Sequence, residues 1–267
     1  MFILHIILYV NKPRACYYGA TVNTIIPQQH YIEDDVLLVH KPVGISSFGV
    51  IRKLRPILNT KKIGHAGTLD PLAKGLMIIG INAGTKKMNT YLKLPKTYLA
   101  EVLIGKSTTT GDLEGVVVEE KKVYKDDIKL NDIEDTVMNM IGIHTLSVPI
   151  YSAIKVQGKP LYTYARAGIT PPYIPEKDMH ITSIQLLDTY HAGACQAVQV
   201  RVEVTSGSYI RTLGEELGRR LGYPATLKSL YRTKIAEYHD TDAYRIDQLP
   251  SQHTRLHGIL KLLFGHS

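Results

Sequence analysis

The sequence predicts a mixed α/β (α+β) domain built around one sheet. Several segments rich in β-branched residues alternate with polar positions and are bounded by Gly, Asp and Pro, which is typical of strands. Amphipathic helical segments fall between them irregularly, without the rhythm of regular βαβ units. With 267 residues, 44% of them apolar, the chain can bury a full core as one large domain or two small ones.

Five segments have the composition and alternation of strands. They are residues 36–39 (VLLV), 76–81 (LMIIGI), 97–105 (TYLAEVLIG), 115–120 (GVVVEE) and 197–206 (AVQVRVEVTS).

Three segments have helical periodicity. Residues 46–58 begin with Ser46 or Ser47 as the N-cap. Residues 132–142 form the second helix, and residues 209–224 form the third, which Gly222 and Pro224 end. The predicted buried faces are Phe48, Ile51, Leu54 and Leu58 in the first, Ile133, Val137 and Ile141 in the second, and Leu213, Leu217 and Leu221 in the third.

Charge and cysteine content indicate the class of partner and the compartment. The net charge of +8 and the pI near 9.2 favour a polyanionic partner. Cys16 and Cys195 lie too far apart in the sequence to form a disulfide framework or a metal-spacing pair, so we expect a reducing, cytoplasmic location. The apolar run at residues 1–10 is too short to span a bilayer, and we expect no membrane association.

The periodic pattern also suggests boundaries. Residues 1–31 show no sustained period and are expected to form an N-terminal extension of unknown role. A single catalytic unit is expected over residues 32–249. Residues 250–267 have room for one short helix but not for a further domain.

The segment KIGHAGTLDPLAKG, residues 62–75, is the candidate site. Asp70 before Pro71 can cap a helical turn, which is a structural role. However, Pro71 biases Asp70 toward an extended conformation, and the glycines at 64 and 67 allow a ligand to approach closely. Such a loop can present the Asp70 carboxylate outward, with His65 and Thr68 beside it.

Other chemistries lack their motifs. Gly105, Lys106 and Ser107 resemble the end of a phosphate-binding P-loop, but Ala100 stands where that motif requires its first glycine. The sequence contains no dinucleotide-binding G-x-G-x-x-G after a strand, no histidine pair at zinc spacing and no G-x-S-x-G elbow. Cofactor-free chemistry at one acidic residue remains.

An ordered series of motifs resembles the TruB family of tRNA pseudouridine synthases over residues 36–238. The motifs are HKPVGISS, KIGHAGTLDPLAKGLMIIGINAGTK, KTYLAEVLIGKSTTTGDLEG, YSAIKVQGKPLYTYARAG and SGSYIRTLGEELGRRLG with LKSLYRTKIAEY. The resemblance implies a mixed, mainly antiparallel sheet flanked by helices, with an RNA-gripping insertion at about 149–175. It also implies that uridine 55 in the T arm of tRNA is isomerised without metal or organic cofactor. The family's C-terminal PUA domain is not expected in the short tail.

The resemblance assigns roles to seven residues. Asp70 matches the catalytic aspartate and Arg211 the arginine that pairs with it. Tyr209 matches a tyrosine near the reacting uridine and is the nearest candidate for an acid or base. The substrate-binding matches are Lys41, His65, Tyr98 and Leu230, of which Tyr98 stacks on the base. Without the resemblance, Tyr98 and Tyr209 are more simply explained as core residues.

The chemistry leaves two routes open. Asp70 can act as the covalent nucleophile, or it can assist a proton removal that yields a glycal intermediate. The loop itself offers no second acid.

Flipping the base out of its stack costs a few kcal/mol, and stacking on Tyr98 returns roughly 1–3 kcal/mol, so phosphate contacts must supply most of the RNA-binding energy. Three basic segments are candidates for these contacts: residues 52–62, 159–168 and 219–232.

Three positions depart from the family pattern and predict weaker or less selective RNA binding. Leu146 and Val148 stand where the family has a glutamine and a proline, and Tyr231 replaces an arginine.

The alternative function is a non-catalytic RNA-binding or RNA-folding module that uses the same cleft. A monomer without an obligatory protein partner is the default expectation.

Overall fold

The computed structural model describes residues 26–246. Strands β1–β15 span Tyr31–Glu33, Val36–Lys41, Ile63–His65, Lys74–Ile81, Lys96–Ile104, Lys106–Thr108, Val117–Glu120, Gly142–Ser147, Lys155–Val156, Lys159–Pro160, Glu176–Ala192, Cys195–Val204, Ala225–Ile235, Tyr238–His239 and Tyr244–Arg245. Helices α1–α5 span Ser47–Leu58, Met88–Leu92, Leu130–Met138, Leu161–Arg166 and Ile210–Arg220, and the 3₁₀ helices η1–η3 span Gln28–His30, Asn82–Lys87 and Asp240–Asp242.

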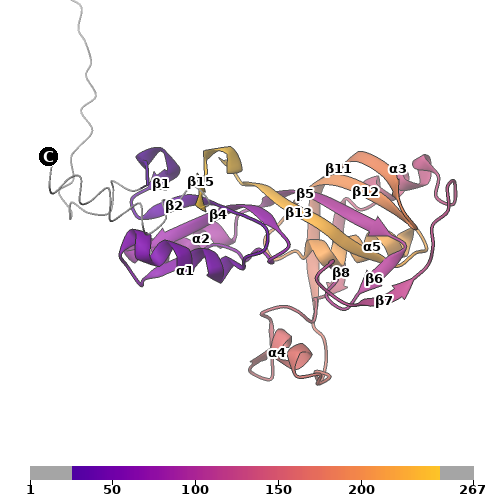
Figure 1. The fold of residues 1–267 in the computed structure, drawn as a ribbon, viewed down its shortest axis with the longest axis horizontal. Helices are drawn as coiled ribbons and strands as arrows, with labels where there is room; N and C mark the ends of the chain where they lie inside the picture. Colours follow the sequence, from indigo (N-terminus) through magenta and orange to yellow (C-terminus); the bar gives the residue numbers. More distant parts are fainter. Residues whose placement is uncertain (1–25, 247–267) are drawn as a thin grey trace, which may run out of the picture.

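One large sheet runs the length of the elongated molecule (Figure 1). Its main path within residues 26–246 is β1-β2-β4-β13-β5-β12-β11-β8. The β4–β13 and β2–β15 pairs are parallel, and the other pairs in this sheet are antiparallel. The predicted mixed, mainly antiparallel sheet is therefore confirmed.

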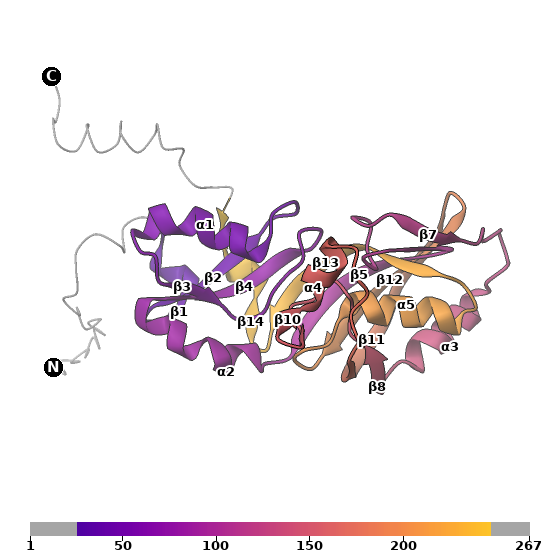
Figure 2. The same cartoon turned by 90° about the horizontal axis from the view of Figure 1, so that it is seen from below.

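Helices cover both faces of the β2–β4 half. Leu37 and Val39 of β2 pack in the same cluster as Leu54 of α1, whereas Val36 and Leu38 pack in a second cluster with Met88 of α2. Figure 2 shows α1 and α2 on opposite sides of these strands. Because both faces are covered, β2 is buried along its whole length, which explains the unbroken apolar run in its sequence.

Helix α1 corrects one predicted core residue. Ser46 is the N-cap, since its side chain accepts a hydrogen bond from the Gly49 N–H at 3.0 Å. Ile51, Leu54 and Leu58 are buried as expected, but the Phe48 side chain is 54% exposed. The helix packs through a face centred on Val50 and Leu54, and Phe48 lies outside that face.

The second predicted helix is shorter than expected. Helix α3 ends at Met138, and Ile141 is exposed beyond it, although Ile133 and Val137 are buried as predicted. Helix α5 buries Leu213 and Leu217 as expected. Strands β8, β11 and β13 were not among the predicted segments; β11 exposes much of its length and alternates irregularly, so it lacks the signal of a half-buried strand.

Packing begins upstream of the expected boundary at residue 32. Ile26 is fully buried in the main cluster, and β1 pairs with β2. Residues 1–25 and 247–267, which include the predicted tail, lie outside the described residues. No helix within residues 26–246 is long and apolar enough to cross a membrane.

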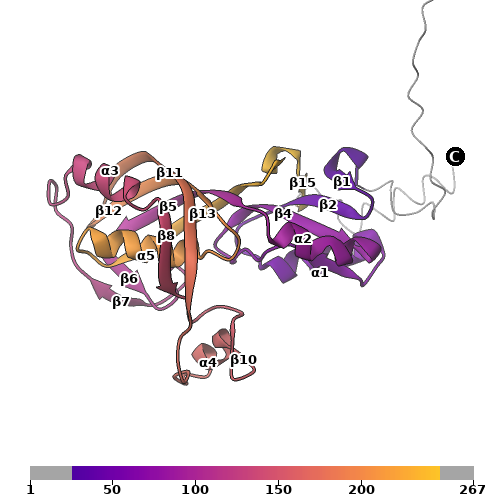
Figure 3. The same cartoon turned by 180° about the vertical axis from the view of Figure 1, so that it is seen from behind.

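A protruding segment leaves the sheet between β8 and β11 and carries β9, β10 and α4. Figure 3 shows it below the sheet, at the position of the expected insertion at 149–175. Val148, Val156 and Leu161 form its small buried cluster, against which Ile154 and Tyr209 pack.

Candidate active site

The loop that carries Asp70 connects β3 to β4. Gly67 has φ +99°, a left-handed conformation that glycine adopts readily. Pro71 and Leu72 form a turn, which the Ala73 N–H closes by donating to the Asp70 carbonyl at 3.1 Å. Asp70 therefore precedes a single turn and does not cap a helix.

Side chains from three other elements hold the backbone of this loop. Ser47 Oγ donates to the Leu69 carbonyl at 2.9 Å and accepts from the Leu69 N–H at 2.8 Å. Arg232 of β13 donates to the carbonyls at 67 and 68 at 3.3 and 3.5 Å, and it is almost fully buried. Strands and a helix distant in sequence thus fix the residues that precede Asp70.

Lys41 holds the other end of the loop. Its ammonium donates to the carbonyls of Ile45 (2.6 Å), Pro42 (2.9 Å) and Pro71 (3.3 Å). The residue is fully buried, and burial lowers the pKa of its amine to about 8, against the opposing charge of Asp70. This placement gives Lys41 a supporting position under the loop, and its expected substrate contact stays a prediction.

Asp70 forms an ion pair with Arg211 of α5. Arg211 Nε lies 3.0 Å from Asp70 Oδ2, and the two side chains are 6% and 37% exposed. Burial raises the pKa of the Asp70 carboxyl, Arg211 opposes that shift, and the charge of Asp112 adds to it. The Asp70 carboxylate is thus accessible to solvent, while the Arg211 guanidinium that it contacts is buried.

The guanidinium of Arg211 is held by groups other than Asp70. It donates to the Thr110 carbonyl at 2.7 Å and to the Tyr151 carbonyl at 3.0 Å, and Asp112 Oδ2 lies 3.9 Å from its Nε. Tyr151 lies at the start of the insertion. Arg211 therefore contacts the loop of Asp70, the 109–115 loop and the insertion.

Asp112 is the residue that sequence reasoning missed. It is buried, and its carboxylate accepts from Thr110 Oγ1 at 2.5 Å and from the Glu114 N–H at 3.1 Å. A second acid is therefore present at the site, although it comes from the 109–115 loop and not from the loop of Asp70. The sequence signal for this loop was the TTGDLEG stretch, residues 109–115, whose Gly and Asp residues are typical of turns. In the structure, Gly111 has φ +73°.

The aromatic and apolar candidates gather in the main cluster. Tyr98 and Leu230 are both nearly buried, on neighbouring strands β5 and β13, and share this cluster with Leu69. Tyr209 precedes α5 and packs partly buried against the same cluster. Burial raises the pKa of its phenol, and the nearby charge of Arg211 opposes that shift. These residues thus pack in the core and also lie near the loop of Asp70.

His65 lies on β3 and pairs in register with Ile79 of β4. Its Nδ1 atom is buried without a hydrogen-bond partner, which is unusual for a polar atom in a folded chain. Burial lowers the pKa of the imidazole, and the Arg232 charge adds to this effect.

The structure also bears on two charged segments, residues 105–107 and 219–232. Lys106 and Ser107 lie on strand β6, so no helix follows Gly105 and the P-loop interpretation is wrong. In the basic segment at 219–232, Arg219 and Arg220 pair with Glu216, and Lys228 pairs with Glu101. Arg232 is buried, whereas the Arg219 side chain is 73% exposed, so binding of phosphates by this segment stays a prediction.

Tyr231, one of the departures from the family pattern, has a structural contact. Its hydroxyl donates to Asp240 Oδ2 at 2.8 Å, and burial with this bond raises the pKa of the phenol to about 12. Asp240 is nearly buried and also pairs with His40 at 2.8 Å. Lys74 lies over the Tyr231 ring, 5.1 Å from its centroid.

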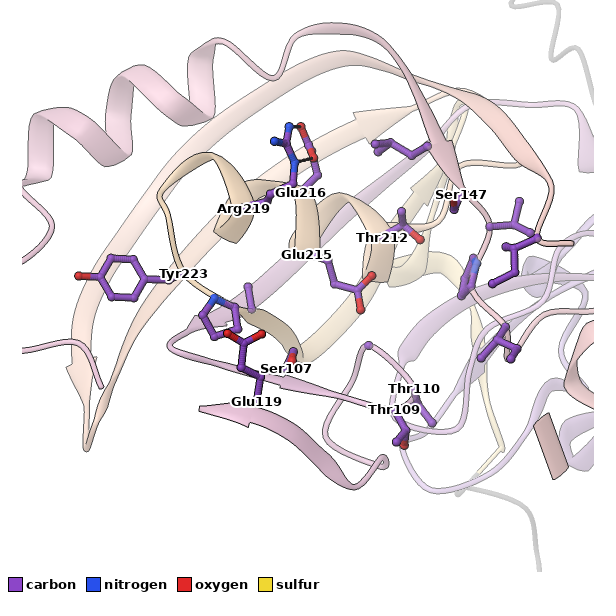
Figure 4. Close-up of a pocket in the computed structure, with 18 of the residues that line it drawn as sticks. Ser107, Thr109, Thr110, Glu119, Ser147, Thr212, Glu215, Glu216, Arg219 and Tyr223 are labelled. Atoms are coloured by element: carbon purple, nitrogen blue, oxygen red, sulfur yellow. Dashed lines mark hydrogen bonds and ion pairs between the residues drawn. The ribbon is translucent and has the colours of Figure 1, made fainter. Parts of the chain in front are cut away.

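A pocket of about 880 Å³ is lined by residues 109–111 and by Thr212, the residue after Arg211 on α5. Figure 4 shows Thr212 and Glu215 of α5 directed into it and the Arg219–Glu216 pair at its edge. Leu146 and Val148, the other two departures, line it near the stem of the insertion. Asp70 does not line this pocket.

Comparison with known proteins identifies the family. Residues 55–210 match the TruB family pseudouridylate synthase (N terminal domain). The chain is 40% identical over 218 residues to tRNA pseudouridine synthase B of Bacillus subtilis (strain 168), covering 81% of this chain and 70% of that protein. It is 40% identical over 203 residues to tRNA pseudouridine synthase B of Limosilactobacillus reuteri (strain DSM 20016), covering 75% and 67%.

Solved structures share the fold at lower identity. A chain of an H/ACA RNP bound to a substrate RNA containing 2′-deoxyuridine has a TM-score of 0.58 at 21% identity, and one from a Cbf5-Nop10-Gar1 complex has 0.60 at 22%. The overlap covers 87% of this chain but only 56% of either solved chain. Because the family match extends over more than half of the sequence and agrees with relatives at 40% identity, the chain belongs to the TruB family of pseudouridylate synthases.

Proposed function

We propose that this protein isomerises uridine to pseudouridine at position 55 in the T arm of tRNA, with Asp70 as the catalytic group. The printed names of its relatives, tRNA pseudouridine synthase B, support the substrate class. The observation that carries the proposal is the 3.0 Å pair between Asp70 and Arg211, which brings two distant motifs together around an accessible carboxylate.

The reaction conserves atoms. The C1′–N1 bond breaks, the uracil turns, a C1′–C5 bond forms, and the C5 proton is lost while N1 gains one. An ionised Asp70 can attack C1′ as a nucleophile or assist removal of a ribose proton to give a glycal. Arg211 favours the ionised form in both routes because its charge opposes the effect of burial on the Asp70 pKa.

Four side chains near the loop are proposed to receive the flipped nucleotide. Tyr98 offers its ring for stacking, and Leu230 packs beside it in the same cluster. His65 has an unpartnered buried Nδ1 that can accept or donate to the nucleotide, depending on the tautomer. Tyr209 remains the nearest candidate for the proton transfer, because the charges of Asp70 and Arg211 both act on its phenol.

The test is tritium release from C5-labelled uridine in a T-arm transcript, with no metal or cofactor added. We expect release by the parent protein and at least ~10³-fold slower release by Asp70→Asn, with RNA binding retained. A parent that binds the transcript without releasing tritium would instead support the non-catalytic RNA module.

The proposal extends to the state of the enzyme. We propose a monomer that needs no obligatory protein partner, in which Asp70, Arg211 and Asp112 form the site by contacts within the chain. The buried free thiol of Cys195 agrees with a reducing cytoplasmic location. Light scattering on the active protein tests the first point: a dimer that loses activity on dilution would contradict it.

A further inference from the structure

We propose that Phe48, together with Arg52, Lys53 and Arg55 of α1, forms a second RNA-binding surface that stacks an unpaired base of the substrate away from Asp70. This inference rests on the proposed function, since it assigns a further contact to the same RNA. We call these four residues the α1 platform.

The Phe48 side chain is accessible for stacking. It is 54% exposed at the start of α1, on a helix whose other apolar side chains mostly face the core. The guanidinium carbons of Arg52 and Arg55 lie 5.9 and 5.4 Å from the ring centroid. An exposed aromatic ring flanked by guanidinium groups is the arrangement on which proteins stack single-stranded bases.

The cations of the platform are not neutralised inside the described part of the chain. None of Arg52, Lys53 and Arg55 forms an ion pair with a carboxylate there, and Arg55 Nε is buried without a hydrogen-bond partner. This differs from the segment at 219–232, in which Arg219, Arg220 and Lys228 already have partners. The platform therefore keeps its charge available for phosphates.

A hollow lies at the start of the same helix. It has a volume of about 440 Å³ and is lined by the first turn of α1 and the preceding loop, with Arg52 and Lys53 on its wall. The amide groups at the start of a helix and its dipole favour an anion at such a place. The ring and the hollow thus match the two parts of a nucleotide, its base and its phosphate.

The start of α1 is bonded to the loop that carries Asp70. Ser47, the neighbour of Phe48, exchanges two hydrogen bonds with Leu69, the neighbour of Asp70. The Gly44 N–H also donates to the Pro71 carbonyl at 2.8 Å. Phe48 and Asp70 therefore lie on segments that are bonded to each other, and the proposal has one RNA contact both.

The chain contains no tryptophan, so Phe48→Trp creates a single fluorescent reporter. In an Asp70→Asn background, we expect a T-arm transcript to quench this tryptophan, whereas heparin, which carries charge but no bases, leaves it nearly unchanged. Tyr124→Trp is the matched control, because Tyr124 is exposed in the connection between β7 and α3, at the opposite end of the molecule from α1 (Figure 1). We expect no quenching there.

Affinity measurements separate stacking from charge. Phe48→Ala is expected to weaken transcript binding about tenfold, with an unchanged slope of log Kd against log salt, and Phe48→Tyr should restore binding. Replacing Arg52 and Lys53 by Gln should lower that slope by up to about 2. The same Phe48→Ala loss should appear in KM for tritium release.

Each contrary outcome has a distinct meaning. Unchanged transcript affinity in Phe48→Ala, or a tryptophan at 48 that is blue-shifted before RNA is added and insensitive to it, overturns the inference and indicates a solvated cluster or a protein contact. Tritium release by the parent would still support the proposed function in that case. Quenching at 48 without any tritium release would support the surface while the proposed function fails.

Discussion

The catalytic loop and the protruding insertion meet at Arg211 but are held in different ways. The backbone of the loop from Gly67 to Pro71 is bonded by Ser47, Arg232 and Lys41, which are buried and come from separate elements. The insertion rests mainly on one small apolar cluster of Val148, Val156 and Leu161. It leaves Ile169 and Tyr173 largely exposed.

This difference suggests a division of labour. A reacting carboxylate needs a fixed position, because small displacements of a catalytic group cost large factors in rate. A surface that grips RNA can rest on a few adaptable apolar contacts. Substitutions of the residues that hold the Asp70 loop should therefore act mainly on kcat, and substitutions in the insertion mainly on KM. The following experiments test this difference.

The largest effect is expected at Arg211. Arg211→Met removes the charge that opposes burial, so the pKa of Asp70 rises further and a smaller fraction is ionised at any given pH. We expect kcat to fall about 100-fold or more, since a transition-state interaction is lost. The acid limb of the pH–rate profile should also move to higher pH.

Arg211→Lys is the control for that shift. It keeps the charge but cannot reach the carbonyls of both Thr110 and Tyr151, so the rate should fall while the acid limb stays near that of the parent. Equal acid limbs in the parent and in Arg211→Met would contradict the electrostatic role.

The second effect is expected at Arg232. Arg232→Met leaves the carbonyls of Gly67, Thr68 and Leu76, the last of them buried, without the donor that this side chain supplies. We expect the free energy of unfolding to fall by about 2–4 kcal/mol and kcat to fall more than KM changes. Denaturant unfolding and tritium release measure the two quantities. Arg201→Met, at an exposed position on β12, is the matched control and should change neither.

A smaller effect is expected at Ser47. Ser47→Ala removes both hydrogen bonds to Leu69 and should cost about 1–2 kcal/mol of folding free energy, with a several-fold loss of kcat. Ser46→Gly, which affects only the cap of α1, should cost a few tenths of a kcal/mol and leave kcat close to that of the parent. Equal losses of kcat in both variants would show that Ser47 acts only through the helix.

The smallest effect on chemistry is expected in the insertion. Leu161→Ala opens the cluster that docks this segment, so KM for the transcript should rise several-fold while kcat changes by less than about twofold. Steady-state kinetics at saturating RNA separates the two. A loss of kcat as large as that of Ser47→Ala would mean that the insertion also positions Asp70, through Tyr151 and Arg211.

Local signals predicted the elements whose pattern matches their burial. Strands β2, β4, β5, β7 and β12 appear where alternation or unbroken apolar runs indicated them, and α1 begins at a predicted cap. Strands β11 and β13 gave no comparable signal, because their burial depends on neighbours that are distant in sequence. Phe48 was misplaced because helical spacing alone does not fix the edge of the buried face.

For the site, the motifs predicted Asp70 and Arg211 as partners, and the structure brings them together. The same motifs did not predict the buried support by Lys41 and Arg232, nor the second carboxylate, Asp112. The role of such residues depends on which backbone groups face them after folding. Sequence spacing carries no record of those groups.

The sequence by itself determined the sheet-based fold class, the family resemblance and the loop that carries Asp70. Those features depend on residue order within short segments, such as Gly67 three residues before Asp70 and Pro71 directly after it. Only the tertiary structure decided which carbonyls the buried cations hold, which acid approaches Arg211 and which cations stay free on α1. The physical reason is that hydrogen bonds and ion pairs depend on distances between segments, and those distances exist only once the chain has folded.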